Sequence, residues 1–312
     1  MPLAMTQNID GEKNQYMNDI THSGFVAIVG RPNVGKSTLL NRFIGEKLVI
    51  TSPKPQTTRN RITGIINRGR AQLVFFDTPG VHASGKLFNQ YMTKKALSTL
   101  AEVEAVLFMV DSTKGVTEAE KIIAEKLAEV DAKKFLIVNK VDSGPRRAVD
   151  FKVLGDFDGV YEISALKGDG VEGLLSLLAA AMPEGPVYYP DDAITDRPER
   201  FIAQEYIREK VFELTGEELP YSVAVTVESW EDKPSKNVSV VYATIHVERN
   251  SQKAIIIGKG GQMIKEIGKR ARKDLQELLG TKVFLDLHVG VEHNWTKSPH
   301  QLKRFGYDDG DR

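Results

Sequence analysis

Two glycines, a lysine and a serine stand at fixed spacing in the stretch GRPNVGKST, residues 30–38. The stretch fits the pattern G-x-x-x-x-G-K-[ST], and it lies between an apolar run typical of a buried strand and a pattern typical of a helix. In such a loop, backbone N–H groups and the helix N-terminus surround a polyphosphate. Lys36 would contact the β- and γ-phosphates, and Ser37 would offer its hydroxyl to Mg²⁺. The pattern predicts a nucleotide triphosphate site; the alternative is a chance match in an ordinary turn.

Three later motifs predict which base this site binds. DTPG, residues 77–80, supplies a carboxylate for Mg²⁺ through water and the Gly80 N–H for the γ-phosphate. NKVD, residues 139–142, supplies the carboxylate of Asp142, which can accept two N–H bonds from guanine, whereas adenine has no matching pair of donors. SAL, residues 164–166, could present backbone N–H groups to guanine O6. All three follow strand-like runs, and open α/β sheets bind ligands at the carboxyl ends of their strands.

Together the four motifs predict binding of GTP and GDP rather than ATP. The aliphatic stem of Lys140 would lie along the base. The predicted GTP-binding residues are Gly30, Arg31, Pro32, Asn33, Val34, Gly35, Lys36, Ser37, Thr38, Asp77, Thr78, Pro79, Gly80, Val81, Asn139, Lys140, Val141, Asp142, Ser164, Ala165 and Leu166.

A second glycine turn, GKGG at 258–261, has no hydroxyl for Mg²⁺ and no acidic strand end nearby, so it is a poor nucleotide site. It joins two predicted helices, 251–257 and 261–280. A glycine turn there lets the backbone approach a sugar–phosphate chain, and the helix ends and Lys259 favour anions. This is the pattern of the G-X-X-G turn of a KH domain, which clamps about four nucleotides of a single strand. The alternative is a plain turn between helices.

The charge around this turn favours the RNA interpretation. Between Arg249 and Lys282 nine basic residues face three acidic ones, a local net charge of +6 in a chain whose 42 basic and 42 acidic residues otherwise cancel. A solvated helix face is the alternative. Three aromatic residues, Tyr221, Trp230 and Trp295, could stack on bases or pack in the core. The predicted RNA-binding residues are Gly258, Lys259, Gly260, Gly261, Lys265, Lys269 and Arg272.

The elements that must position these motifs fall into two predicted domains. From Gly24 to Met182 short apolar runs alternate with helical patterns, which predicts an α/β P-loop domain with a mostly parallel sheet and helices on both faces. After four prolines within a short stretch, the order becomes α-β-β-α-α-β, which predicts an α+β domain. The expected boundaries are a flexible N-terminal extension at 1–22, the GTPase domain at 23–182, a linker at 183–198, the RNA-binding domain at 199–307 and a tail at 308–312.

Composition excludes several classes of protein. The chain has no cysteine, which excludes disulfides and cysteine-ligated metal sites. No apolar run is long enough to cross a bilayer, and the first 23 residues lack the apolar core of a signal peptide. We therefore expect a cytoplasmic protein.

The four nucleotide motifs resemble those of the translation-factor-type GTPases. The segment PKPQTTRNR, residues 53–61, resembles switch I of the bacterial Era family, in which a GTPase domain precedes a type II KH domain. The resemblance spans about residues 22–307. It includes ELPYSVAV at 218–225, ARKDLQELLG at 271–280, NW at 294–295 and FGY at 305–307.

The resemblance implies roles for single residues. Thr58 would be the switch ligand of Mg²⁺ beside Ser37 and Asp77, with Thr57 next to it, although TT alone could be two exposed loop threonines. Val81 stands where Ras-like GTPases carry a water-orienting glutamine. The resemblance implies K⁺ held through Asn33 instead, unless Asn33 only shapes the loop. The predicted catalytic residues are Lys36, Thr58, Gly80 and Asn33, and His82 is either a base or a solvated loop residue.

The resemblance also implies a biological role. A member of this family would bind the single-stranded 3′ end of 16S rRNA and the 30S ribosomal subunit, act in ribosome assembly as a monomer, and contact the inner face of the cell membrane peripherally. We expect slow intrinsic hydrolysis of GTP that RNA accelerates. Two alternatives stay open: an RNA-binding assembly factor with GTP as a structural ligand, and a membrane-associated GTPase whose basic helix binds acidic lipid. A tRNA-modifying GTPase would need a catalytic cysteine or a cofactor domain.

Overall fold

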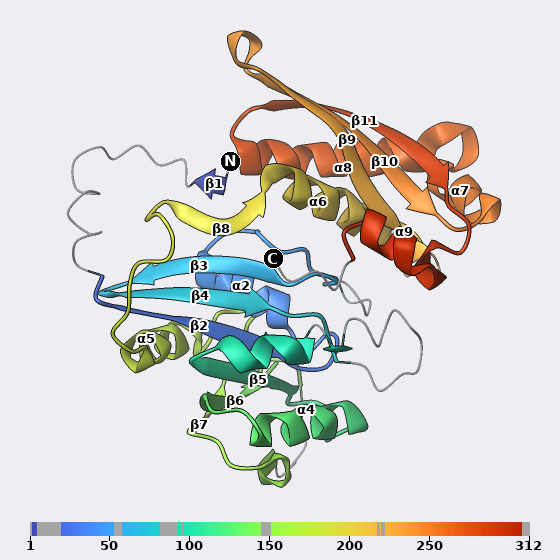
Figure 1. Ribbon diagram of the computed structural model, residues 1–312. Helices are drawn as coiled ribbons and strands as arrows, with labels where there is room; N and C mark the ends of the chain where they lie inside the picture. Colours follow the sequence, from blue (N-terminus) through green and yellow to red (C-terminus); the bar gives the residue numbers. More distant parts are fainter. Residues whose placement is uncertain are drawn as a thin grey trace. The chain divides into compact units, whose positions relative to one another are not determined.

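The computed structural model describes residues 2–4, 20–52, 58–81, 93–94, 96–144, 151–216, 219 and 222–307. The chain divides into two compact units, and Figure 1 shows the elements of each. The described residues of 2–49 and 58–197 form the first unit, and those of 50–52 and 198–307 form the second. Residues 50–52 belong to the second unit, where the Thr51 N–H donates to Glu209 Oε1 at 3.0 Å.

The first unit is built on a six-stranded sheet in the order β3-β4-β2-β5-β6-β7. All neighbouring pairs are parallel except β3 and β4. Every residue of β4 and β5 is buried, as expected for central strands covered on both faces. The strands are β2 His22–Val29, β3 Ile62–Arg68, β4 Ala71–Asp77, β5 Ala105–Asp111, β6 Lys133–Asn139 and β7 Gly159–Glu162. The predicted mostly parallel sheet is confirmed.

Helices cover both faces of this sheet. Helices α2 (Lys36–Ile44) and α5 (Val171–Ala181) contact each other and strand β4. Helix α4 (Glu118–Ala128) buries Ile123 and Leu127 in a core shared with Phe108 of β5. Short 3₁₀ turns at η1 (Thr99–Glu102) and η2 (Phe151–Leu154) complete this layer.

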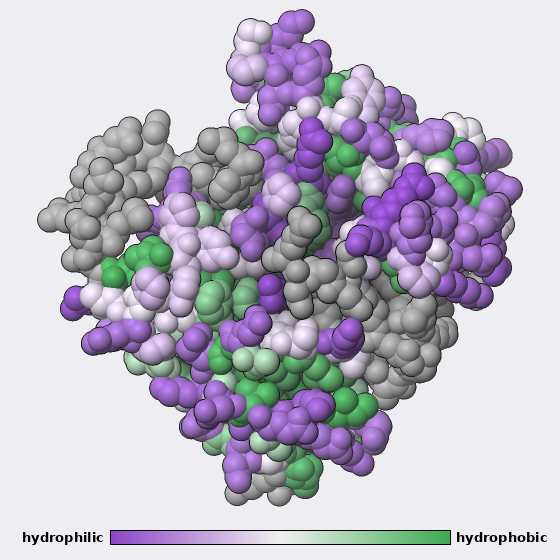
Figure 2. Space-filling view, viewed as in Figure 1, coloured by the Kyte–Doolittle hydropathy of each residue, from purple (hydrophilic) through white to green (hydrophobic). Residues whose placement is uncertain are grey.

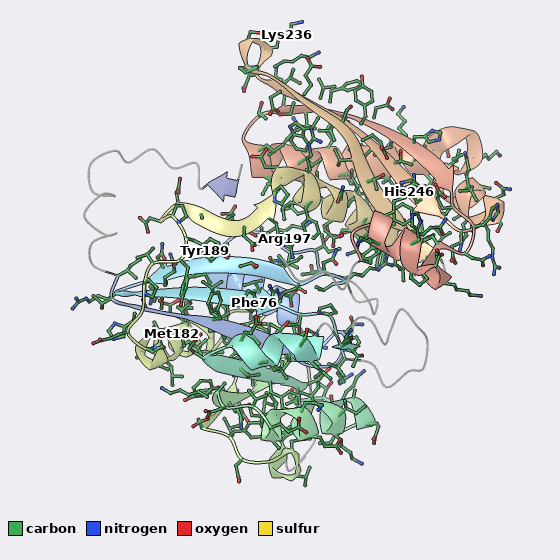
Figure 3. All side chains as sticks on the ribbon, viewed as in Figure 1. Phe76, Met182, Tyr189, Arg197, Lys236 and His246 are labelled. Atoms are coloured by element: carbon green, nitrogen blue, oxygen red, sulfur yellow. The ribbon has the colours of Figure 1, made fainter. Side chains whose placement is uncertain are left out.

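The expected linker, 183–198, lies against the first unit through residue 197. The buried side chain of Gln72 accepts from the N–H groups of Tyr188 and Tyr189 and donates to the Tyr189 carbonyl, and Figure 3 labels Tyr189. Thr195 donates to the Thr63 carbonyl at 2.6 Å. Residues Ala193–Pro198 form strand β8, which pairs with β1 (Pro2–Ala4) within the expected N-terminal extension. Polar groups of β3 and β4 thus hold this proline-rich segment in place.

The second unit contains the order α-β-β-α-α-β that the sequence predicts. Its sheet has the order β11-β10-β9, with β9 antiparallel and β11 parallel to β10. Helices α6, α7 and α8 share one core with the sheet, which includes Ile207, Ile245, Ile256 and Ile267. The elements are α6 Glu199–Leu214, β9 Ala224–Lys233, β10 Val238–Val247, α7 Asn250–Ile257, α8 Gln262–Leu279, β11 Lys282–Val291 and α9 Pro299–Arg304.

The contacts of Trp295, near the C-terminal end of this unit, show whether it is available for base stacking or packs in the core. Trp295 is fully buried, stacks on Tyr307 and donates from Nε1 to the Ser222 carbonyl at 3.0 Å. It is therefore a core residue. Trp230 is half-buried and donates to Asp232, and Tyr221 lies outside the described residues.

Hydrophilic side chains dominate the visible face of the second unit in Figure 2. Lys236, at the tip between β9 and β10, is one of them (Figure 3). Within the part of the chain that the structure describes, no helix combines the length and apolar character that crossing a membrane requires.

Candidate functional sites

Lys36, the first residue of α2, is buried against the phosphate loop. Its side chain is 6% exposed, and its ammonium donates to the carbonyls of Gly30 and Arg31 at 3.1 Å each. Burial lowers the pKa of Lys36 to about 8, and the nearby Asp77 carboxylate only partly opposes this. A buried ammonium whose charge is only partly compensated favours an anionic ligand, because a phosphate would stabilise its charged form.

The backbone of this loop depends on close contact with the base motif. Gly35 has φ of 107°, and any side chain there would collide with the amide of Asn139. That amide donates from Nδ2 to the Val34 carbonyl at 2.7 Å. Asn33 is exposed and adopts a left-handed conformation with φ of 63°, so it does shape the loop.

Three oxygen-bearing side chains converge beside the loop, as predicted for Mg²⁺. Ser37 Oγ lies 2.7 Å from Asp77 Oδ2 and 2.8 Å from Thr58 Oγ1, and Thr58 Oγ1 lies 3.2 Å from the same carboxylate oxygen. Asp77 Oδ1 is buried and has no hydrogen-bond partner among the residues that the structure describes. Two hydroxyls and a carboxylate with an unused oxygen fit a hard cation such as Mg²⁺.

The buried carboxyl group of Asp77 is sensitive to its surroundings. Burial raises its pKa to about 6, and the Lys36 charge with hydrogen bonds from Ser37 and Thr58 only partly offsets this. A divalent cation would favour the ionised form, so cation binding and deprotonation of Asp77 are linked.

The DTPG motif is fixed against the phosphate loop. Thr78 donates to the Ile28 carbonyl at 2.7 Å, and the Val81 N–H donates to the Gly30 carbonyl at 3.3 Å. A side chain at Gly80 would collide with Pro32 of the loop. The Val81 side chain is fully buried, while Thr57 and His82 lie outside the described residues.

The base motif is joined to the SAL segment by one amide. Asn139 Oδ1 accepts from the Ala165 N–H at 2.9 Å, so Asn139 links the phosphate loop and the SAL segment. A hydrogen bond from Ser164 lowers the pKa of Asp142 and holds its carboxylate ionised at this edge. The predicted guanine-binding residues are thus brought together.

Sequence reasoning missed Arg42 in this site. Arg42 lies in the last turn of α2 and donates to the carbonyls of Ala165 and Leu166. It therefore holds the SAL segment through its carbonyls, whereas Asn139 binds the Ala165 N–H. A basic residue in the last helical turn was the only sequence signal, and it is too common to be diagnostic.

The second glycine turn connects α7 to α8 with little side-chain bulk. Gly258 has φ of 71°, and a Cβ there would lie 2.7 Å from Met263 Cβ. Gly260 is also left-handed, with φ of 59°, but a Cβ there would meet open space. Lys259 is exposed between them. The turn thus presents backbone and a single cation to solvent.

A groove of about 340 Å³ runs between α8 and β11 in the second unit. The predicted basic residues Lys265, Lys269 and Arg272 all line it, because they are spaced along one face of α8. Its remaining lining is mainly apolar: Ile264, Gly268, Leu285 and Leu287, with Asp286. Sequence reasoning missed the contribution of β11. Cations along an apolar floor suit a chain of phosphates carrying flat bases.

Comparisons with known proteins agree with this division. Residues 25–140 match the family model described as 50S ribosome-binding GTPase, and residues 218–296 match the model described as KH domain. The chain is 51% identical over 291 residues to GTPase Era of Geotalea uraniireducens (strain Rf4), which covers 92% of this chain and 98% of that protein. It is 52% identical over 290 residues to GTPase Era of Geobacter metallireducens, covering 91% and 97% respectively.

Two solved structures are similar over nearly the whole chain. One is Era in complex with MgGDPNP and nucleotides 1506–1542 of 16S ribosomal RNA, with a TM-score of 0.86 and 39% identity over 92% of this chain and 99% of that one. The other is a variant of Aquifex aeolicus Era bound to GDP.AlF4⁻, with a TM-score of 0.85 and 38% identity over the same shares.

Proposed function

Because this chain belongs to the Era family of GTPases, we propose that it is a Mg²⁺-dependent GTP switch that binds the 3′ end of 16S rRNA through its KH domain. We propose further that it acts on the 30S subunit during ribosome assembly, as a monomer in the cytoplasm. One observation carries this proposal: a complete set of GTP motifs and a basic groove beside a glycine turn occur in one chain. The similar Era structure that holds both MgGDPNP and 16S rRNA nucleotides supports the pairing.

The geometry of the first site accounts for hydrolysis of GTP. The reaction joins a water oxygen to the γ-phosphorus and breaks the bond from that phosphorus to the β–γ bridging oxygen, giving GDP and phosphate. Lys36 would compensate the charge on the β- and γ-phosphates, and the Gly80 N–H would contact the γ-phosphate. Ser37, Thr58 and Asp77 would hold Mg²⁺, which when bound supplies a Lewis acid for the phosphate oxygens.

The position that orients the attacking water in Ras-like GTPases carries no polar side chain in this chain. The buried, apolar Val81 occupies the place of a water-orienting glutamine. We propose that K⁺ at the phosphate loop, held with the help of Asn33, contributes the missing charge stabilisation. Hydrolysis should then be several-fold faster in K⁺ than in Na⁺, and Asn33→Ala should remove that difference. Equal rates in both salts would contradict the K⁺ proposal.

The geometry of the second site accounts for single-strand RNA binding. Backbone of the GKGG turn and Lys259 would contact the sugar–phosphate chain, and Lys265 and Lys269 would continue the cationic track along α8. The apolar groove floor, including Leu285 and Leu287, would receive the bases.

RNA binding is tested by the fluorescence anisotropy of a labelled oligonucleotide matching the 3′ end of 16S rRNA, against a scrambled oligonucleotide of equal length. We expect tighter binding of the matching sequence. The double variant Gly258→Asp, Gly260→Asp, checked for folding by circular dichroism, should lose this binding because it places two negative charges in the turn. Equal binding of both oligonucleotides would contradict the proposed preference for the 3′ end of 16S rRNA. Stronger binding to phosphatidylglycerol vesicles would favour lipid association and contradict the RNA proposal.

A further inference from the structure

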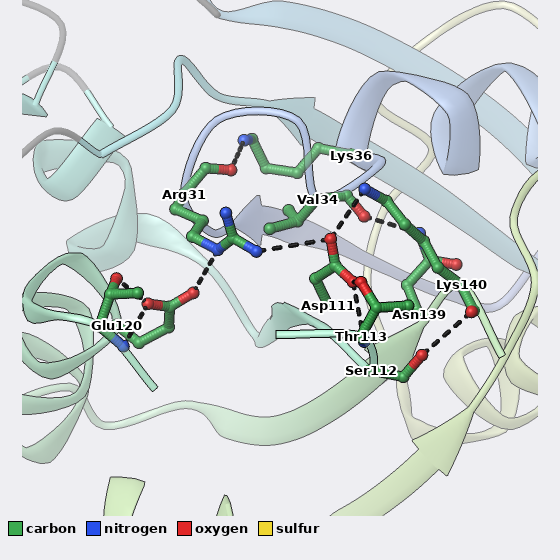
Figure 4. A network of polar contacts seen from close by, with 10 residues as sticks. Arg31, Val34, Lys36, Asp111, Ser112, Thr113, Glu120, Asn139 and Lys140 are labelled. Atoms are coloured by element: carbon green, nitrogen blue, oxygen red, sulfur yellow. Dashed lines mark hydrogen bonds and ion pairs between the residues drawn. The ribbon is translucent and has the colours of Figure 1, made fainter. Parts of the chain in front are cut away.

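Strand β5 ends in a carboxylate that belongs to none of the four nucleotide motifs. Asp111 is 3% exposed, and its Oδ2 accepts from Lys140 Nζ of the base motif at 2.9 Å (Figure 4). The same Oδ2 lies 3.4 Å from Arg31 Nη2 of the phosphate loop. Its Oδ1 accepts from both the N–H and the hydroxyl of Thr113, at 3.0 and 2.6 Å. One buried carboxylate therefore contacts both the phosphate loop and the base motif.

Arg31 has a second acidic partner on helix α4. Its Nε lies 2.6 Å from Glu120 Oε1. Glu120 is itself fixed, because its Oε2 accepts from the N–H and hydroxyl of Thr117 in the capping box of α4. Loss of Asp111 would leave Arg31 paired with Glu120, whereas Lys140 would lose its side-chain partner in the network drawn in Figure 4.

Lys140 also needs this support for its backbone. It adopts a left-handed conformation with φ of 67°, which costs free energy for a residue with a side chain. Ser112, next to Asp111, donates its hydroxyl to the Lys140 carbonyl at 3.0 Å and its N–H to the Asn139 carbonyl at 2.9 Å. The end of β5 thus fixes the base motif through both side chain and backbone.

The charges explain why an acid is needed at this position. Although burial opposes ionisation, hydrogen bonds from Thr113 and Lys140 bring the pKa of Asp111 below its usual value. An ionised Asp111 lies within ion-pair distance of both Lys140 and Arg31, so it offsets the positive charge of both side chains. Lys140 is thereby held where its aliphatic stem can lie along a guanine ring.

We propose that Asp111, with Ser112, is a positioning residue for guanine-nucleotide binding that holds Lys140 of the base motif and Arg31 of the phosphate loop in register. It acts through its contact with Lys140. This inference rests on the proposed GTP site, and binding of GDP by the unaltered protein tests that premise separately.

A double-mutant cycle distinguishes positioning from a general role in stability. Asp111→Asn and Lys140→Met should each weaken GDP binding roughly tenfold, measured by titration calorimetry on the full chain. In the Lys140→Met background, Asp111→Asn should add less than about twofold, since its effect passes through Lys140. Steady-state hydrolysis by Asp111→Asn should show a raised KM for GTP with kcat changed far less.

Matched variants keep the test decisive. Glu120→Gln leaves the contact of Asp111 with Lys140 intact, so it should change GDP affinity less than Asp111→Asn does. Ser112→Ala removes only the bond to the Lys140 carbonyl and should weaken GDP binding about threefold. If Asp111→Asn does not fold, the GDP affinity of Ser112→Ala tests the proposal instead. Wild-type GDP affinity in Asp111→Asn or, failing that, in Ser112→Ala would overturn the proposal, as would additive effects in the cycle.

Discussion

The two glycine turns of this chain build opposite kinds of site. The phosphate loop is enclosed: Lys36 and Asp77 are buried, and Asn139 closes the loop from the base side. The GKGG turn is open, with an exposed Lys259. The difference fits the two ligands, because a small polyanion needs oriented groups in a water-poor site, whereas a long chain of phosphates is bound by exposed cations and backbone.

The contrast between the two sites should be largest in the loss of ligand affinity when one charged side chain is removed. Lys36→Ala removes a buried cation that we propose contacts the β- and γ-phosphates, so it should weaken GTP binding about a thousandfold. RNA affinity in the absence of nucleotide should stay unchanged, because the groove lies wholly in the second unit. Calorimetry with GTP and anisotropy with the rRNA oligonucleotide measure the two effects. A loss of only a few-fold in GTP affinity would show that the loop is not enclosed as described.

The enclosed site should also depend on pH. The pKa of Asp77 is raised to about 6, so below pH 6 its carboxyl group is protonated and must lose a proton to bind Mg²⁺. The apparent Mg²⁺ affinity for GTP hydrolysis should fall about tenfold per pH unit below 6 and be flat above it. The variant Asp77→Asn should bind Mg²⁺ weakly at every pH.

The same pKa fixes the sign of an effect on stability. Because the pKa of Asp77 is raised in the folded protein, the Mg²⁺-free folded state binds more protons than the unfolded chain between the unfolded value of 3.8 and about 6. The Asp77 contribution to the free energy of unfolding therefore decreases as pH rises through this window. Urea denaturation with and without Mg²⁺ at pH 5 and pH 7, with Asp77→Asn as the control, measures this contribution. A Mg²⁺-free contribution of Asp77 that increases with pH would contradict the prediction.

Within the open turn, two glycines should respond differently. Gly258→Ala forces a Cβ against Met263 in addition to its left-handed strain, so RNA affinity should fall roughly tenfold. Gly260→Ala meets open space and should cost only about 1 kcal/mol of backbone strain, measured by thermal unfolding, with a much smaller loss of RNA affinity. Equal losses of RNA affinity in both variants would contradict the inference that the close approach of Gly258 to Met263 makes the difference.

The smallest effects should come from single cations along the groove. Lys269→Ala should weaken RNA binding about three- to fivefold and lower the slope of log K against log salt by about one. Lys273, on the same helix, does not line the groove and approaches Glu277 at 3.6 Å, so Lys273→Ala is the matched control. If both variants lose RNA affinity equally, the helix acts as a diffuse basic surface rather than as one wall of a groove.

Sequence reasoning predicted the parts of the molecule that follow local rules. The phosphate loop, the base motif and the cations of α8 each depend on spacing within a short segment. Within the first unit the structure joins the phosphate loop to the base motif, and within the second unit it lines one groove with the α8 cations, both as expected. Asp111 was missed because an acid at a strand end matches no motif until its partners from other loops are known. The packing of 183–197 was hidden because a proline-rich segment does not reveal that Gln72 will satisfy its backbone. Long-range polar pairing was the missing information in both cases.

The most direct test of the account is GTP hydrolysis in K⁺ buffer with and without the oligonucleotide matching the 3′ end of 16S rRNA. If the enclosed and the open site work as one switch, this RNA should stimulate hydrolysis, and the Gly258→Asp, Gly260→Asp variant should keep its basal rate but lose the stimulation. Unchanged hydrolysis by the unaltered protein with RNA bound would contradict the account, because it would leave two independent sites in one chain.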